Sequence, residues 1–185
     1  DLIEGRNSVV IISAGGLGLL ALKIIQAAYS INPIVVDIDD EKLKLAKQAG
    51  ASEVINSRDE NLHEKIAEHT NGGATSVIDF VGASETYELA SGMFGMKRGG
   101  TYVIVGLIGG ETNQQLPMIT LTARTIRGVY VGSLQEMSEL MDLVKNNKID
   151  HIDVEKRNVS EANKTLNDLK NGKINGLVCL THDHE

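Results

Sequence analysis

The stretch SAGGLG at 13–18 combines residue types and a spacing that suit phosphate binding. It follows an apolar run, VVII, and precedes an apolar-faced helical pattern, LLALKIIQAA. A helix that starts at such a turn presents unpaired backbone N–H groups and positive partial charge to an anion. Gly15 lets the backbone approach the phosphates, and Gly18 lets the helix lie close to the strand. The stretch therefore predicts a turn that binds a pyrophosphate.

One acidic residue, Asp37, strengthens this prediction. It stands near the end of the second apolar run and follows Gly18 at about the 20-residue spacing of dinucleotide-binding units. Its carboxylate can accept hydrogen bonds from both ribose hydroxyls of an adenosine and would repel the additional phosphate of NADP. The next residue is Ile38, so no arginine follows to neutralise that phosphate. We therefore predict an NAD site. We prefer it to two simpler interpretations, which are a glycine-rich turn that binds no ligand and an Asp37 that serves only as a solvated helix cap.

Ser13 occupies the first position of the glycine pattern. Its hydroxyl either points at a phosphate or is simply small enough for the turn, and we prefer the second interpretation. A serine would cost on the order of 1 kcal/mol at this position if the turn requires a positive φ.

The elements that position these residues alternate between short apolar runs and helical patterns. Nearly continuous apolar runs are typical of strands covered on both faces, and alternation with helices indicates right-handed units in an open parallel sheet. The predicted strands are 9–12, 33–38, 76–81, 101–106 and 125–132, with a weaker one at 53–55. The predicted helices carry the stripe Leu17–Ala28, a segment at 41–49 capped by Asp39 or Asp40, a segment around Leu62 and Ile66, and a segment from a Ser84 cap towards Met93.

The pattern changes after Gly132. We expect a helix around Met137–Val144, a strand at 153–159, a helix capped by Ser160 and a last strand at 176–180 that buries Cys179. This tail has too few apolar residues for a core of its own. We therefore divide the chain into a dinucleotide-binding domain, 1–132, and a C-terminal α/β extension, 133–185.

Composition narrows the function classes. The formal net charge of −7 argues against nucleic-acid binding, and no apolar run is long enough to cross a membrane. The single cysteine excludes a disulfide framework, and we therefore predict a cytoplasmic location. The five histidines are scattered along the chain, and we predict no metal site and no catalytic residue. Because the chain starts with DLIEGRN rather than Met, we expect a segment of a longer protein.

Several segments together resemble a known family. SAGGLG, VVDIDDEKLKLAKQAGASEVIN, VIDFVG, GGTYVIVG, TIRG and EANKTLNDLKNGKING follow the order and spacing of the coenzyme-binding half of the medium-chain dehydrogenase/reductases, with the zinc-dependent alcohol dehydrogenases as the most similar branch. The resemblance covers nearly the whole chain. It implies a Rossmann fold, that is, a doubly wound six-stranded parallel sheet, and an NAD(H) site.

The resemblance also implies roles for individual residues. Asp37 would hold the adenosine ribose, with Ile38 against the adenine and Lys42 near the ribose or phosphates. The remaining implied contacts are Ser13, Gly15, Gly16, Leu17 and Gly18 at the pyrophosphate, Val81 and Gly82 at the adenosine, and Val105, Gly106, Leu107, Val129 and Val131 at the nicotinamide.

Further expectations follow from how this family is assembled. The edge strand at 125–131 would pair with its copy in a homodimer. Catalytic zinc and most substrate contacts would come from an N-terminal half that nothing in this chain resembles. The family often carries an arginine that reaches the pyrophosphate, where this chain has Asn175 and Leu177. Weaker phosphate binding is one consequence to expect.

The function expected from these observations is that of the NAD-binding domain of an alcohol dehydrogenase, able to bind NADH but inactive alone. Two alternatives stay open: a stand-alone NAD-sensing module without catalysis, and an NADPH-dependent quinone or enoyl reductase of the same superfamily, against which Asp37 argues. A methyltransferase would share the acid after the second strand, but the order of the motifs through residue 180 makes that class a poor match.

Overall fold

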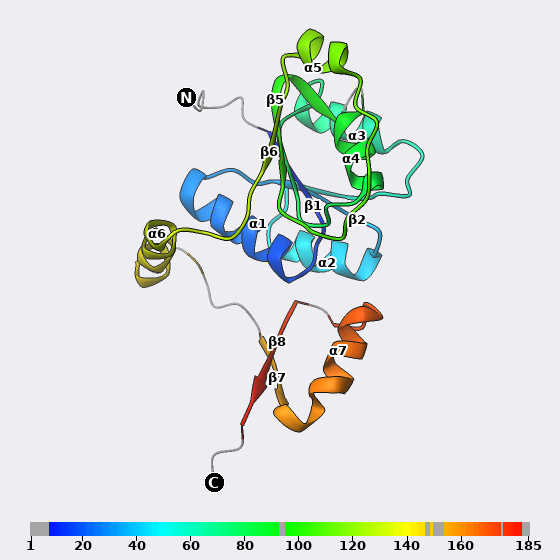
Figure 1. The fold of residues 1–185 in the computed structure, drawn as a ribbon. Coiled ribbons are helices and arrows are strands. Elements are labelled where there is room, and N and C mark those ends of the chain that lie inside the picture. The colour runs from blue at the N-terminus through cyan, green and yellow to red at the C-terminus, as the bar shows by residue number, and fades with distance from the viewer. Residues whose placement is uncertain (1–7, 93–94, 147–148, 150–153, 175, 183–185) are drawn as a thin grey trace.

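The computed structural model describes residues 8–92, 95–146, 149, 154–174 and 176–182. Its main unit (Figure 1) is a six-stranded parallel sheet. The strand order is β3-β2-β1-β4-β5-β6, which confirms the doubly wound sheet. The chain runs outward from β1 in one direction through β2 and β3, and then in the other direction from β4. Ligands of such sheets bind at this reversal, outside the carboxyl ends of the strands. The strands are β1 (Val9–Ile12), β2 (Ile34–Asp37), β3 (Glu53–Asn56), β4 (Ala74–Asp79), β5 (Met96–Ile104) and β6 (Thr125–Gly128).

Helices cover both faces of the sheet, which explains the continuous apolar runs. Val10 and Ile12 of β1 face one core cluster, and Ile11 between them faces the other. The first cluster is covered by α3 (Leu62–Thr70) and α4 (Ser84–Ser91), and the second by α1 (Gly16–Tyr29) and α2 (Asp40–Gln48).

Two of the helix starts test the predicted caps. Asp39 is the N-cap of α2, where its Oδ1 accepts a hydrogen bond from the Glu41 amide at 2.9 Å. The prediction for α4 was wrong, because its N-cap is Ala83 and Ser84 is already helical. The Ser84 hydroxyl instead donates to the Glu111 carbonyl at 2.8 Å, a contact distant in sequence that no local pattern reveals.

A short helix, α5 (Leu116–Thr122), was missed. It has seven residues and none of them is buried, and so short a segment is below the window of about 11 residues over which apolar periodicity is recognised. The strand predicted at 125–132 ends at Gly128, and every residue of β6 is exposed. No helix among the described residues is both long and apolar enough to cross a membrane.

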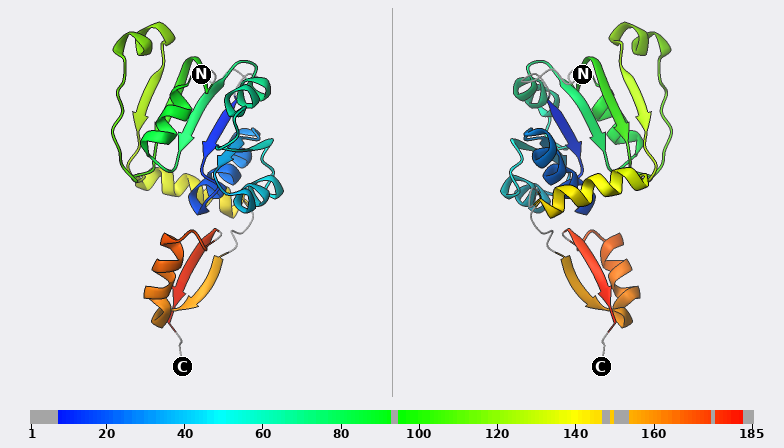
Figure 2. Two further views of the ribbon diagram at one scale, coloured as in Figure 1. Left: turned by 90° about the vertical axis from the view of Figure 1, so that its right-hand side faces the viewer. Right: turned by 90° about the vertical axis from the view of Figure 1, so that its left-hand side faces the viewer.

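The C-terminal segment forms α6 (Leu134–Lys145), β7 (Val154–Asn158), a 3-10 turn (Val159–Glu161), α7 (Ala162–Lys170) and β8 (Leu177–Thr181). β7 and β8 pair in parallel in a sheet of their own. Figure 2 shows that the strand arrows of the main sheet point towards the end of the molecule where α6 and this small unit lie.

Two predictions for this segment were wrong. Ser160 does not cap α7, because the N-cap of that helix is Glu161. Ser160 lies in the 3-10 turn before it, where its amide donates to Asn158 Oδ1 at 2.9 Å. Cys179 is exposed rather than part of a core. Its neighbour Leu180 is exposed as well, so neither face of this small two-stranded sheet is fully covered at these positions.

Candidate functional site

Ser13 begins the turn between β1 and α1, and the turn does require a positive φ, since Ser13 has φ +94°. Its amide donates to the Val36 carbonyl at 2.8 Å, and its Oγ accepts from the Gly15 amide at 3.2 Å. Its own carbonyl oxygen lies only 1.9 Å from where a Cβ on Gly18 would stand. Gly18 is therefore needed because the helix backbone passes directly over this carbonyl.

The start of α1 has the features of an anion site. Gly15, its N-cap, provides no side-chain hydrogen bond, and the first turn contains no acidic residue. The first hydrogen bond of the helix runs from the Leu19 amide to the Gly15 carbonyl at 2.9 Å. The amides of Gly16, Leu17 and Gly18 have no hydrogen-bond partner among the described residues. Their partial positive charge is available to a phosphate.

Asp37, at the carboxyl end of β2, points to the same turn. Its Oδ2 accepts from the Ala14 amide at 2.6 Å, and its Oδ1 accepts from the Asp39 amide at 3.0 Å. A carboxylate has about four acceptor positions, so each oxygen keeps capacity for a further donor such as a ribose hydroxyl. Asp37 thus both braces the turn and remains able to accept from a ligand.

A cavity of about 490 Å³ lies between the carboxyl ends of β1, β2 and β4. It brings together four of the predicted site residues, namely Ser13, Asp37, Ile38 and Val81. Its lining is mostly apolar, and Ile38 remains 58% exposed and so available for contact with a ring. Sequence reasoning missed its other lining residues, which are Ile12, Val36, Ser57, Leu62, His63, Ala83, Glu85, Thr86, Glu88 and Leu89.

A signal for some of these residues was present in the sequence. Ser57 follows β3 and Ala83 follows β4, so the rule that ligands lie at the carboxyl ends of strands would have included both. His63 is one of the five scattered histidines, to which the sequence assigns no role. Its Nε2 lies 3.2 Å from the Leu89 carbonyl oxygen, a pairing between two helices that spacing does not reveal.

Gly82 and Gly106 serve the packing of two turns against each other. A Cβ on Gly82 would lie 2.1 Å from the Gly106 carbonyl oxygen, and a Cβ on Gly106 would lie 2.1 Å from the Val81 carbonyl carbon. The backbones after β4 and β5 therefore touch directly. This contact is by itself a sufficient reason for glycine at both positions.

The other predicted residues lie outside the cavity. Lys42 is in the first turn of α2, and Val105 follows β5, where its amide donates to the Asp79 carbonyl at 2.9 Å. Leu107 and Val131 are 79% and 76% exposed. Val131 also has φ +50°, a rare conformation for a β-branched residue, and such strain is found where surrounding structure imposes it. Val129 continues from β6, with its amide donating to the Ile104 carbonyl at 2.9 Å.

The C-terminal unit reaches back to the glycine turn. A Cβ on Gly16 would lie 2.5 Å from Leu177 Cδ2 and 2.8 Å from the Gly176 carbonyl oxygen. Gly16 is therefore small because β8 begins against it. Asn175, the other residue predicted near the phosphates, lies outside the described residues.

The conformation of Ser13 leads to a testable prediction. Ser13→Ala loses the hydrogen bond to the Gly15 amide but keeps a side chain at positive φ, whereas Ser13→Gly loses the bond and relieves the strain. We expect the unfolding free energy of Ser13→Gly to exceed that of Ser13→Ala by about 1 kcal/mol. Urea denaturation of both variants measures this difference, and a Gly variant no more stable than the Ala variant would contradict the strain.

The described residues do not fit a zinc ion. Among them, no group of three or more His, Cys, Asp or Glu side chains could hold a metal. His151 and His184 lie outside the described ranges. We therefore assign no zinc chemistry to the groups that the structure places.

Comparison with known proteins agrees with this geometry. A family model described as zinc-binding dehydrogenase matches residues 16–146. An NAD-dependent alcohol dehydrogenase of Sulfurisphaera tokodaii is 33% identical over 181 residues, which cover 97% of this chain and 52% of that protein. An alcohol dehydrogenase of Geobacillus stearothermophilus is 35% identical over 176 residues, which cover 93% and 49%.

Solved structures give the same result. The alcohol dehydrogenase of Aeropyrum pernix matches with a TM-score of 0.85 and 30% identity over 94% of this chain and 49% of its own. An acetophenone reductase of Geotrichum candidum, solved in complex with NAD, matches with a TM-score of 0.81 and 25% identity over 97% of this chain and 50% of its own. The chain spans about half the length of the curated relatives it matches. The matched fold, the match to the family model over most of the chain and these identities show that the chain belongs to the zinc-binding dehydrogenase family.

Proposed function

We propose that this chain is the NAD(H)-binding part of an oxidoreductase that transfers hydride between an alcohol and NAD. The observation that carries the proposal is the convergence of the uncapped start of α1 and the Asp37 carboxylate on the turn that borders one apolar cavity. The relatives named NAD-dependent alcohol dehydrogenase support the choice of coenzyme and reaction. NADPH is disfavoured because Asp37, Glu85 and Glu88 give the cavity wall negative charge.

The residues of this chain have binding and orienting roles. The amides of Gly16, Leu17 and Gly18 receive the pyrophosphate, Asp37 accepts from the ribose hydroxyls, and the adenine lies between Ile38 and Val81. Backbone groups of Val105, Leu107, Val129 and Val131 orient the nicotinamide end. Gly106 lets the turn after β5 pack against Val81, and Lys42 lies near the ribose or the phosphates. When bound, the nicotinamide ring supplies the hydride chemistry.

A titration tests this proposal. The purified chain is titrated with NADH and with NADPH, and binding is followed by calorimetry or nicotinamide fluorescence. We expect saturable binding of NADH and at least about tenfold weaker binding of NADPH, equivalent to about 1.4 kcal/mol. No binding of either nucleotide would contradict the proposed site, and a preference for NADPH would favour a reductase of the same superfamily.

We further propose that a second half completes the enzyme and that the boundary near Gly132 separates the coenzyme domain, 1–132, from an extension, 133–185, that packs on that half. Apolar side chains on α6 and α7 remain uncovered, such as Met137 at 56% and Leu166 at 63% exposure. During hydride transfer the oxygen of the alcohol or carbonyl substrate needs a Lewis acid or a proton donor beside it. The residues assigned to the coenzyme site do not provide one, and zinc in the other half would supply it. The chain alone should then bind NADH without oxidising alcohols, and NADH formation by the purified chain would contradict this.

The absence of disulfides among the described residues fits a cytoplasmic location, which cell fractionation checks.

A homodimer is also part of the proposal. β6 is an edge strand with all residues exposed, and Tyr130 beyond it is 80% exposed. Unpaired edges with apolar side chains associate readily, so we propose that residues 125–131 pair with a second copy. Sedimentation velocity should give twice the mass of the chain, and a monomer at every concentration would contradict the pairing.

A further inference from the structure

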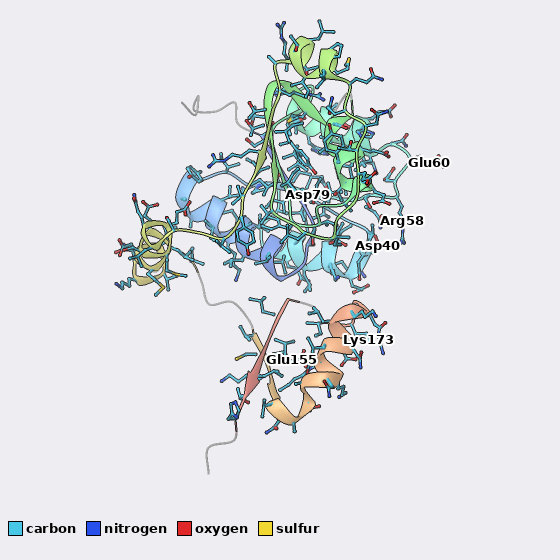
Figure 3. All side chains as sticks on the ribbon, in the orientation of Figure 1. Asp40, Arg58, Glu60, Asp79, Glu155 and Lys173 are labelled. Carbon is cyan, nitrogen blue, oxygen red and sulfur yellow. The ribbon has the colours of Figure 1, made fainter. Side chains whose placement is uncertain are left out.

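A buried carboxylate, Asp79, lies at the centre of the turns that border the cavity. It ends β4 and is fully buried. Figure 3 shows it inside the main unit, whereas Asp40, Arg58 and Glu60 lie at its periphery. A buried charge requires several hydrogen-bond partners to offset its lost hydration.

Asp79 has four such partners, and they divide into two pairs. Its Oδ1 accepts from the amides of Val81 at 2.8 Å and Gly82 at 3.0 Å. Its Oδ2 accepts from the hydroxyls of Thr86 and Tyr102, both at 2.6 Å. The first pair fixes the turn after β4, and the second connects that turn to α4 and β5.

The main chain of Asp79 extends this arrangement to the turn after β5. Its carbonyl oxygen accepts from the amides of Val105 at 2.9 Å and Gly106 at 3.0 Å. One residue therefore holds both turns whose backbones touch at Gly82 and Gly106. The bond from Val105 continues the parallel pairing of β4 with β5, whereas the bond from Gly106 is additional to it.

Thr86 connects Asp79 to the cavity wall. Its Oγ1 donates to Asp79 and accepts from the Ala83 amide at 3.0 Å, so it fixes the first turn of α4. Thr86 and Ala83 both line the cavity, as does Val81. Every one of these wall residues is linked to the Asp79 carboxylate by one or two hydrogen bonds.

Tyr102 provides a contrast within the same network. Burial, and then the hydrogen bond to Asp79, raise the pKa of its phenol well above the ordinary value, so the hydroxyl remains a donor. Tyr102 does not line the cavity and bonds to neither turn. It stabilises the carboxylate without holding the wall.

From these contacts we infer that Asp79 is a positioning residue for the coenzyme: its negative charge holds the Val81–Gly82 turn and, through Thr86, the adenosine-facing wall in the shape that binds NADH. This inference rests on the proposed function. It assigns a role in coenzyme affinity to a residue that does not touch the coenzyme.

The test compares Asp79→Asn with Tyr102→Phe. An asparagine has nearly the same shape, and its neutral oxygen can still face the two amides, but charge-assisted bonds are about twice as strong as neutral ones. We expect Asp79→Asn to raise the Kd for NADH about fivefold or more, and Tyr102→Phe to leave it within about twofold, although both lower the urea midpoint. A purely structural role would move the midpoint alone.

The outcomes are distinguishable. Failure of the wild-type chain to bind NADH would contradict the proposed function. Wild-type binding with equal NADH affinities of Asp79→Asn and Tyr102→Phe would overturn the positioning role alone. Should Asp79→Asn not fold, hydrogen exchange of the wild-type chain decides: NADH must slow exchange of the Val81 and Gly82 amides, and unchanged exchange at both would overturn the role.

Discussion

Replacement of Gly18 by alanine should destabilise the chain by about 3 kcal/mol, the upper end of the usual cost of overpacking. The added Cβ would stand 1.9 Å from the Ser13 carbonyl oxygen, which belongs to the backbone and cannot rotate away. Either α1 moves off β1 or the turn changes shape, and both disturb the phosphate-binding amides. Urea denaturation followed by circular dichroism measures the loss, and we expect weakened NADH binding with it.

Gly128→Ala is the matched control. A Cβ at Gly128 meets nothing within 4 Å, and this glycine has no positive φ. At a protein concentration that keeps the chain monomeric, the same methyl group should therefore leave stability unchanged or raise it by up to about 1 kcal/mol. Equal losses in both variants would mean that the close approach of α1 to Ser13 does not constrain the fold.

Asp37→Ala should lower the affinity for NADH by about tenfold or more and reduce the preference over NADPH by a similar factor. The substitution removes the acceptor for the ribose hydroxyls and the charge that repels a 2′-phosphate. It also removes the acceptor of the Ala14 amide at 2.6 Å, so the glycine turn loses part of its support. Parallel titrations with NADH and NADPH give both factors.

Asp40→Ala separates the specific role of Asp37 from a general charge effect. Asp40 is an exposed carboxylate on the next element, and its Oδ1 accepts from Asn56 Nδ2 at 2.7 Å. Its loss changes the net charge equally but removes no group from the cavity. If Asp37→Ala discriminates against NADPH as strongly as wild type, the proposed role of Asp37 is wrong.

The sequence predicts those parts of the fold that depend on local chemistry. β1 and β2 are apolar on both faces because helices cover both faces, and the Asp39 cap acts within its own turn. The starts of α4 and α7 were misplaced because Ser84 bonds to Glu111 and because Asn158 engages Ser160 in a 3-10 turn. Those competing partners become visible only when the chain is folded.

The candidate site divides in the same way. The residues of the glycine turn and Asp37 follow from spacing along one strand–helix–strand unit. Asp79 and His63 could not be predicted, because their partners come from other elements. For Gly16 the family resemblance implied a place at the pyrophosphate, whereas the structure adds a contact with Leu177 from the C-terminal segment.

That contact between Gly16 and Leu177 has a consequence for the order in which the protein forms during synthesis. The six strands of the main sheet are complete at Gly128, so they can pair while the later residues are still inside the ribosome. Gly16, at the start of α1, then lacks its contact with Leu177 until β8 emerges. The C-terminal segment would therefore dock on a glycine turn that β1, β2 and α1 have already shaped.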